Sequence, residues 1–293
     1  MIKLRCKALY AAGVMLVCGA AATADAQAGS SFLDRWQGRA TATQEQQPHW
    51  ATPVATSTAK LDQAMRAEFG RQVNSSRYGT WNLGNSKGLE LIPERHTELI
   101  FGVPPFFDHS APHVKDGFGD VWLQAKFRIY ARNEQHGNAA VTAVLHATIP
   151  TGKDANGICC ATVTPSVAAG KGFGRLIFQG TLGGQLPVTN AAGLGRTVAW
   201  NSVAQYHIGE TGLTRFLWPE FEVNSTFYHG GANDGKIAAF GTPGLVFGRV
   251  LLNHNADGQP GRRALTLAAG EQIALTHFHP YNHALILSLR LPF

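Results

Sequence analysis

The chain has 293 residues, of which 15% are charged and 33 are glycine, and its formal net charge is +6. No run of about 18 apolar residues follows the first thirty residues, so the composition argues against a membrane-spanning helix. The basic residues form no clustered stripe, and no nucleic-acid partner is expected.

The first residues have the features of an export signal. Basic residues at Lys3, Arg5 and Lys7 precede an apolar stretch, and the small residues "ADA" at 24–26 are typical of a cleavage site. We therefore predict a signal peptide over residues 1–26. Cleavage there would lower the net charge to +4 and remove two of the four cysteines.

The other two cysteines, Cys159 and Cys160, are neighbours in the sequence. Adjacent cysteines rarely bridge each other comfortably, and a metal site would need further ligands at a regular spacing. A disulfide in a loop and two unreactive thiols both stay open for this pair.

Residues 27–55 are polar and aperiodic, which predicts a loosely ordered N-terminal arm that lies in the periplasm or plugs a lumen. The next stretch, near 59–70, contains helix formers but also alternates. As an extended chain it would place Leu61, Met65, Ala67 and Phe69 on one face. We interpret it as a strand.

From there on, apolar residues at every second position dominate the chain. The clearest segment is "GDVWLQAKFRIYAR", residues 119–132, in which Val121, Leu123, Ala125, Phe127 and Ile129 share one parity. Similar segments lie near 88–92, 96–103, 138–150, 162–171, 175–187, 196–208, 216–228, 241–252 and 263–275. With the C-terminal tail they number about twelve, and most have the roughly 9–13 residues typical of tilted membrane-spanning strands.

The residues on the second face of these segments distinguish a membrane barrel from a soluble sandwich. In a sandwich the apolar faces share one core and the opposite faces meet water, but here Trp122, Val144, Ile177 and Val203 lie among the polar residues. The connectors also alternate between shorter and longer, with "NHNADGQPGRR" as an exception. We predict an all-β fold over residues 56–293, a single closed antiparallel transmembrane barrel of about 12 strands, with 10 or 14 as alternatives.

The tail "HALILSLRLPF" ends on an aromatic residue preceded by alternating leucines. Leucines on this parity would face acyl chains, and such an ending is typical of the strand that outer-membrane assembly machinery recognises. The predicted assembly signal consists of Leu285, Leu287, Leu289, Leu291 and Phe293. It predicts the outer membrane of a Gram-negative cell as the location, with membrane lipid and the assembly machinery as partners.

Six phrases of the chain are "KGLELIP", "GVPPFF", "DGFGDVWLQAKFRI", "ATIPTGK", "TPSVAAGKGFG" and "VNSTFYHGG". They resemble phrases in the outer-membrane barrels of the MetA-pathway phenol-degradation family, and the resemblance covers roughly residues 48–293. It implies a transporter-like or channel-like barrel, sometimes associated with aromatic catabolism. It supplies no catalytic or binding motif to carry over.

If the apolar parity faces lipid, the opposite parity lines the lumen, where a channel selects its solutes. Both signs of charge occur there, so we expect no strong ion selectivity. We predict a channel-like barrel that passes small, aromatic or hydrophobic solutes; a closed structural barrel whose charges pair across the lumen is the alternative. The candidate lumen-lining residues are Gln124, Lys126, Arg128, His146, Gln179, Gln185, Asn201, Gln205, His207, Glu220, Glu222, Asn224 and Arg290.

A metal site is a weaker alternative. His277 and His279, with His283 nearby, have a spacing that can chelate a metal, but no cysteine or carboxylate completes the set. We expect no metal and no cofactor.

An outer-membrane hydrolase is a further alternative. It would need a nucleophile and a base, and Ser225 with His207 or His229 could supply them, but there is no G-x-S-x-G motif. We expect no enzyme activity, and the sequence leaves the oligomeric state open.

Overall fold

The computed structural model describes residues 31–293 apart from 85–86, 190 and 254–262. The predicted signal peptide, residues 1–26, lies outside the described residues. The chain divides into two compact units, Met1–Gly38 and Arg39–Phe293.

The described part of the first unit forms the beginning of helix α2 (Phe32–Glu45). Ser31 caps this helix, because its hydroxyl oxygen accepts a hydrogen bond from the backbone N–H of Asp34 at 3.1 Å. The Asp34 carboxylate accepts bonds from the N–H and the hydroxyl of Ser31 in return. The expectation of a loosely ordered arm is therefore wrong for these residues. Among the described residues, no helix is both long and apolar enough to cross a bilayer.

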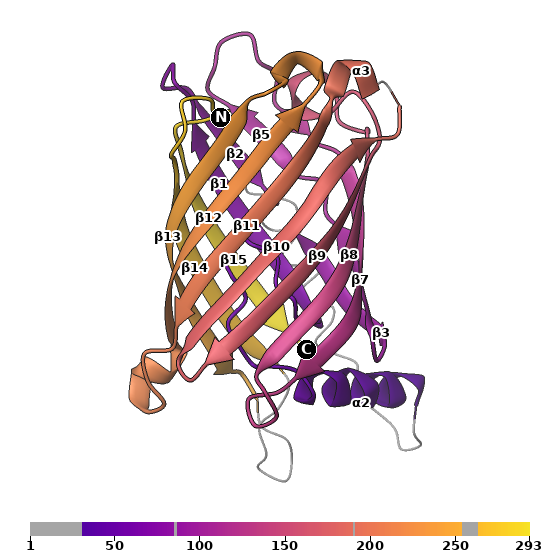
Figure 1. The fold of residues 1–293 in the computed structure, drawn as a ribbon, viewed down its shortest axis with the longest axis vertical. Helices are drawn as coiled ribbons and strands as arrows, with labels where there is room; N and C mark the ends of the chain where they lie inside the picture. The colour runs from indigo at the N-terminus through magenta and orange to yellow at the C-terminus, as the bar shows by residue number, and fades with distance from the viewer. Residues whose placement is uncertain (1–30, 85–86, 190, 254–262) are drawn as a thin grey trace. The chain divides into compact units, whose positions relative to one another are not determined.

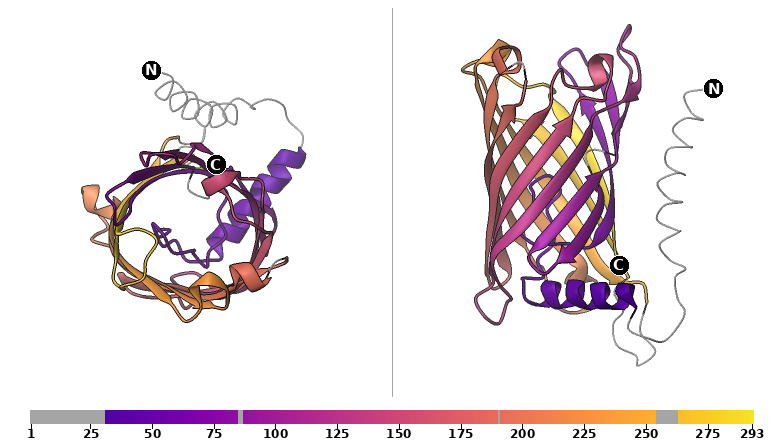
Figure 2. Two further views of the ribbon diagram at one scale, coloured as in Figure 1. Left: turned by 90° about the horizontal axis from the view of Figure 1, so that it is seen from above. Right: turned by 90° about the vertical axis from the view of Figure 1, so that its right-hand side faces the viewer.

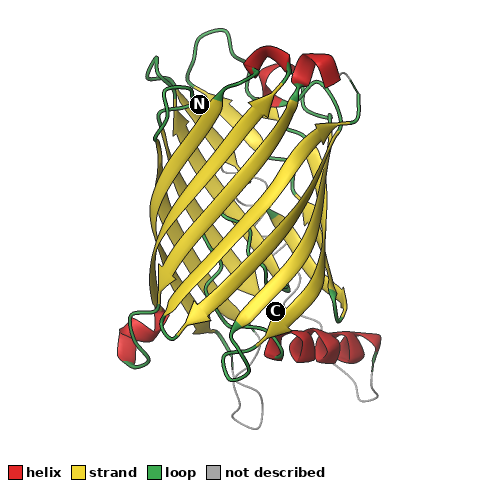
Figure 3. Cartoon of the chain, in the orientation of Figure 1, coloured by secondary structure: helices red, strands yellow, loops and turns green. Residues whose placement is uncertain are grey.

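The second unit is a closed barrel of 12 antiparallel spans (Figures 1 and 3). Pairing of the first strand with the last closes the ring, in a ladder that runs from Ala64 opposite Pro292 to Val73 opposite His283 (Figure 2). The strands are β1 (Ala64–Val73), β2 (Gly79–Leu83), β3 (Gly88–Glu94), β4 (Thr97–Gly102), β5 (Phe106–His109), β6 (Gly117–Phe118), β7 (Val121–Arg132), β8 (Ala139–Ile149), β9 (Thr162–Phe173), β10 (Leu176–Pro187), β11 (Arg196–Tyr206), β12 (Leu217–His229), β13 (Ile237–Leu251), β14 (Ala264–Ala274) and β15 (His283–Pro292).

Three neighbouring spans consist of two strands each. β2 pairs with β1 and β5, whereas β3, further along the same span, pairs with β1 and β4. β5 and β6 likewise continue the spans of β4 and β7. Backbone hydrogen bonds still join neighbouring spans beside these interruptions. The N–H of Val103 donates to the carbonyl of Lys87, and the N–H of Gly119 donates to the carbonyl of Pro105.

The apolar parity of the strands points away from the lumen. Along β7, Leu123, Phe127 and Ile129 are exposed at 43%, 56% and 60%. The alternating residues Lys126 and Arg128 are buried. A water-soluble protein has the reverse distribution, whereas a barrel in lipid hydrocarbon requires an apolar outer belt. The predicted alternation of this strand is confirmed.

Residues 46–63, which we call the luminal segment, run between α2 and β1 inside the ring. They contain no helix or strand and pack against the wall in small apolar clusters. In these clusters Ala59 packs with Ala140, Val144 and Ala168, Leu61 with Ala40 and Ile92, and Val54 with Val246 and Ile286.

The first half of the barrel corrects two predictions. The strand predicted near 59–70 begins at Ala64, which leaves Leu61 in the luminal segment. β2, β5 and β6 lie between the segments predicted to be strands, and they were not predicted because strands of 5, 4 and 2 residues are too short to show an alternating pattern. The other predicted strands are present, with shifted ends.

The connectors define two ends of the barrel. Those after β3, β7, β9, β11 and β13 lie with Phe293 at what we call the C-terminal end, and the others lie at the distal end. The distal connector between β8 and β9 contains Cys159 and Cys160, which are bonded to each other. Of the two readings left open for this pair, the structure contains the loop disulfide.

Other helical turns occur only in connectors of the described chain. They are η1 (Asp154–Asn156), α3 (Ala191–Leu194), η2 (Gly212–Phe216) and η3 (Gly231–Asn233).

Candidate functional site

Two glutamates of β12 hold the luminal segment by its backbone. The Glu222 carboxylate accepts hydrogen bonds from the N–H groups of Ala55 and Thr56 at 2.7 and 2.6 Å, and Glu220 accepts one from Val54 at 2.8 Å. Both glutamates are buried. Buried N–H groups need acceptors, and charged acceptors form the stronger bonds. These carboxylates therefore fix the path of the segment across the lumen.

A row of side-chain amides extends this contact around the wall. The Thr58 hydroxyl donates to Gln179 at 2.8 Å, Gln179 donates to Gln205 at 2.8 Å, and Gln205 donates to Glu220 at 2.6 Å. The last three residues come from β10, β11 and β12, so neighbouring strands contribute successive members. A buried network whose members are paired in this way makes the lumen rigid.

Residues of β4 and β7 hold the segment from the opposite wall. The Lys126 ammonium lies 3.0 Å from the Glu98 carboxylate and donates to the carbonyl of Lys60 at 3.3 Å. Glu98 in turn accepts a bond from the N–H of Asp62 at 2.7 Å. The luminal segment is thus tied to both sides of the barrel.

A small cavity of about 200 Å³ lies beside the interrupted spans. Trp122 and His146 form part of its wall, and their rings stack with centroids 5.1 Å apart and 22° between the planes. Lys87, Glu90 and Ile100 also line it. This cavity combines flat aromatic surface with charged groups of both signs.

A larger cavity of about 560 Å³, which we call the vestibule, lies at the C-terminal end. Its walls come mainly from the luminal segment, the connector between β11 and β12, and parts of β12, β13, β14 and β15. His207 and Trp218 stack there at 4.2 Å with 9° between their rings. The guanidinium of Arg215 lies 4.5 Å from the ring centroid of Phe216.

Thr52, Asp62 and Arg290 line both cavities, and we call these three residues the partition. The Asp62 carboxylate lies 3.7 Å from Arg290 and 3.8 Å from Lys60, and accepts a bond from the Thr52 hydroxyl at 3.1 Å. Burial raises the pKa of Asp62, but the nearby cations, Lys60 first and Arg290 next, outweigh burial and hold this pKa well below its usual range. An ionised carboxylate between two cations therefore stands between the two cavities.

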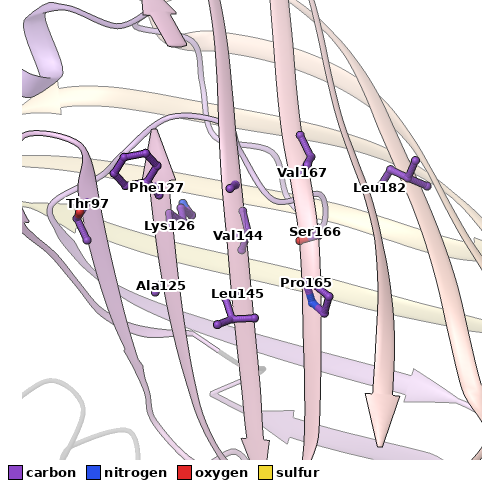
Figure 4. A pocket seen from close by; sticks show the side chains of 11 residues that line it. Thr97, Ala125, Lys126, Phe127, Val144, Leu145, Pro165, Ser166, Val167 and Leu182 are labelled. Carbon is purple, nitrogen blue, oxygen red and sulfur yellow. The ribbon is translucent and has the colours of Figure 1, made fainter. Parts of the chain in front are cut away.

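A third hollow, of about 540 Å³, lies on the outer wall of the barrel. Figure 4 shows Phe127, Leu145, Val167 and Leu182 around it, contributed by four neighbouring strands, β7 to β10. All four side chains are exposed and apolar. The hollow belongs to the lipid-facing surface and not to a solute path.

The structure places most of the predicted lumen-lining residues against the luminal segment or against each other. Those that bond or pair with residues 39–63 are Lys126, Arg128, Gln179, Glu220, Glu222, Asn224 and Arg290. Asn201 and Gln205 bond to neighbours in the wall. Gln124 and His146 line the small cavity and His207 lines the vestibule, whereas Gln185, near the distal end of β10, lines neither.

Sequence reasoning missed the charged residues that lie outside regular alternation. Lys60 and Asp62 belong to the luminal segment, Arg215 to a connector, and Arg249 to an irregular part of β13. Their charge was visible, but an aperiodic segment carries no signal for the side on which a residue lies. Arg66 could have been recognised, by contrast, because it lies on the polar parity of the predicted strand near 59–70.

The histidines considered for a metal site are not assembled into one. His277 and His279 lie in the connector between β14 and β15, and His283 lies 2.6 Å from Glu271. No group of three metal-ligating side chains occurs in the described part of the chain.

Neither histidine considered as a base, His207 or His229, is hydrogen-bonded to Ser225 among the described residues. Ser225 lies on β12 opposite Trp200. The arrangement that a hydrolase would need is therefore not formed by these residues.

No protein-family model and no curated protein matches the chain. Among solved structures, the COG4313 outer membrane channel from Pseudomonas putida F1 is similar, with a TM-score of 0.54, 14% identity, and coverage of 83% of this chain and 100% of that one. The barrel has the fold of an outer-membrane channel. The NanC porin is also similar, with a TM-score of 0.48, 11% identity, and coverage of 78% of this chain and 99% of that one. The prediction of a closed antiparallel barrel of about 12 strands is confirmed, and its apolar outer belt suits lipid hydrocarbon.

Proposed function

We propose that this barrel is an outer-membrane channel for small solutes of low polarity, including aromatic ones. The observation that supports the proposal most is the pair of internal cavities that share Thr52, Asp62 and Arg290. A solute that crosses the barrel would occupy one cavity, pass the partition and leave through the other. The solved outer-membrane channel of the same fold supports this reading.

The direction of the barrel follows from its connectors and its last strand. In outer-membrane barrels the short turns face the periplasm, so the vestibule would open to the periplasm and the disulfide loop to the cell exterior. Leu285 and Leu287 are exposed on β15, as an assembly signal facing lipid requires. Outer-membrane lipid and the assembly machinery are then the proposed partners, after removal of the signal peptide.

Two observations support aromatic solutes. The phrases that resemble the MetA-pathway phenol-degradation family would connect the chain with aromatic compounds. In addition, a stacked pair of rings lines each cavity, Trp122 with His146 in one and His207 with Trp218 in the other. Flat ring faces of this kind pack well against a planar solute.

A closed structural barrel is the second candidate, because the luminal segment is held so firmly. Glu222, Glu220 and Gln179 all bond to it from the wall. If these bonds never open, the partition would block solutes in both directions.

Liposome swelling and single-channel recording on the purified mature barrel separate the two candidates. A channel should give swelling that depends on solute size and discrete current steps, both missing from protein-free liposomes. Shifted migration of unheated protein on a gel would show that the barrel is folded. Folded protein that gives neither swelling nor current would establish the structural barrel instead.

A further inference from the structure

The vestibule carries an excess of basic side chains. Among the described residues that line it, Lys60, Arg215, Arg249 and Arg290 are basic and Asp62 is the one acidic residue. Low-dielectric walls concentrate the field of such a lining, which attracts anions. This excess differs from the balanced charge that the alternating strands alone suggested.

Three other luminal carboxylates do not cancel this excess, because they are engaged elsewhere. Glu220 and Glu222 accept hydrogen bonds from the backbone of the luminal segment, and Glu98 pairs with Lys126. None of these three glutamates lines the vestibule. Asp62, which does, is already shared between two cations.

Two guanidinium groups of the vestibule have donor capacity left. Arg215 forms no ion pair with any residue that the structure describes, and it lies against the ring of Phe216. Arg290 is only 7% exposed, and its Nε is buried without an acceptor in the described part of the chain. A buried donor without a partner is costly, and an anion that reaches it would supply the missing acceptor.

The rest of the lining is apolar and partly flat. Trp50, Phe216 and Trp218 contribute aromatic surface, and Val246 and Leu251 contribute aliphatic surface. The volume of about 560 Å³ lies in the range of roughly 300–1,000 Å³ that is usual for small-ligand sites. A ligand that satisfies this lining has an anionic group at one end and an apolar body at the other.

We propose that the vestibule binds small carboxylates that carry a planar apolar ring, and that these are the solutes the barrel selects. A carboxylate matches the fork of an arginine in two parallel hydrogen bonds. The ring would lie against the stacked pair of His207 and Trp218. The selection of a solute rests on the proposed channel function, but binding to the vestibule can be measured without it.

Benzoate is the probe, with three compounds that each lack one of its features. Benzyl alcohol keeps the ring without the charge, acetate keeps the carboxylate without the ring, and inorganic phosphate keeps charge alone. Titrations of the folded mature barrel in detergent, by calorimetry, should show saturable benzoate binding. Each of the other three should bind about tenfold more weakly or worse, as expected for the loss of a charged hydrogen bond or of the apolar contact.

Variants connect the binding to the vestibule. Arg215→Gln should weaken benzoate binding about tenfold. Trp218→Leu should weaken benzoate binding while leaving the binding of acetate unchanged. Arg132→Gln is the matched control, because Arg132 is exposed at the same end of the barrel and does not line the vestibule. If Arg215→Gln fails to fold, Arg249→Gln takes its place.

The outcomes distinguish the site from the channel. Equal binding of benzoate and benzyl alcohol, or a loss in Arg132→Gln as large as in Arg215→Gln, overturns the carboxylate site even if the barrel conducts. Saturable benzoate binding that depends on Arg215, in a barrel that shows no swelling and no current, supports the site and removes the channel function. Benzoate uptake into liposomes that saturates at the same concentration as binding supports both.

Discussion

The carboxylate of Asp62 lies 3.7 Å from the guanidinium of Arg290, at the place where the two internal cavities share their wall. One side chain comes from the luminal segment and the other from the last strand. The charge that a permeating ion meets at the partition therefore depends on both. Changing either one should alter ion selectivity without altering the lipid-facing surface.

Replacing Asp62 by Asn should make the barrel more selective for anions, and replacing Arg290 by Gln should make it less so. A unit charge about 4 Å from an ion changes its energy by about 1 kcal/mol in water-like surroundings, which corresponds to a roughly fivefold change in the permeability ratio. The reversal potential across a planar bilayer with a potassium chloride gradient measures this permeability ratio. Identical reversal potentials in both variants and the unchanged protein would show that ions do not pass the partition.

The bonds of Glu222 to the backbone of Ala55 and Thr56 lead to a prediction about gating. Glu222→Ala removes both acceptors, and each bond to a charged group contributes about 1.5–3 kcal/mol, so the luminal segment should be released more often. Single-channel recordings should then show longer or larger openings, and the amides of residues 54–56 should exchange with solvent faster.

Glu210→Ala is the control for that experiment, since Glu210 is an exposed residue of a connector. It should leave both currents and amide exchange as they are. If Glu222→Ala gives the same currents as Glu210→Ala, the luminal segment does not limit conduction.

The parts of the barrel that were predictable from the sequence are those whose two faces meet different surroundings. In β7, lipid on one side and a packed lumen on the other impose the alternation of Phe127 with Lys126 and Arg128, which is visible in the sequence. The glutamates of β12 were recognised as luminal for the same reason. The partner that they bind was not recognisable, because Ala55 and Thr56 contribute backbone N–H groups, which every residue except proline has.

The partition and the vestibule were missed for a related reason. They combine residues of the luminal segment, a connector and the end of β15, which come together only when the ladder closes. Sequence spacing gives no register between β1 and β15, so nothing connected Asp62 with Arg290 in advance. The short strands β2 and β5 were not predicted, because strands of 5 and 4 residues are too short to show alternation.

The lipid-facing wall can be tested at Leu145, which is 51% exposed near the middle of β8. Leu145→Arg should lower the free energy of unfolding in liposomes by about 2–4 kcal/mol, the cost of a cation near the middle of the bilayer. Gln135→Arg adds the same charge in an exposed turn and should have little effect. Urea titrations of the reconstituted barrel measure both, and an equal stability of the two variants would contradict the assignment of this face to lipid.

Tyr281, in the connector between β14 and β15, provides a spectroscopic test of the distal end. Its ring stacks on that of Phe240 with the centroids 4.7 Å apart, and its hydroxyl donates a hydrogen bond to Gln272. Gln272 donates in turn to Asn224, and Asn224 donates to Thr56 in the luminal segment. Burial, and next the charge of a nearby tyrosine, raises the pKa of Tyr281 from 10.0 to about 12.

The neutral phenol is thus the form that the folded barrel prefers. Its contribution to stability is complete below pH 10, the value for an unfolded chain, and is lost as the pH rises to about 12. The tyrosinate absorbance of the folded barrel should show a step near pH 12 that disappears in Tyr281→Phe and persists in Tyr78→Phe, a variant of an exposed tyrosine. A step that survives in Tyr281→Phe would mean that this phenol is not buried against Phe240.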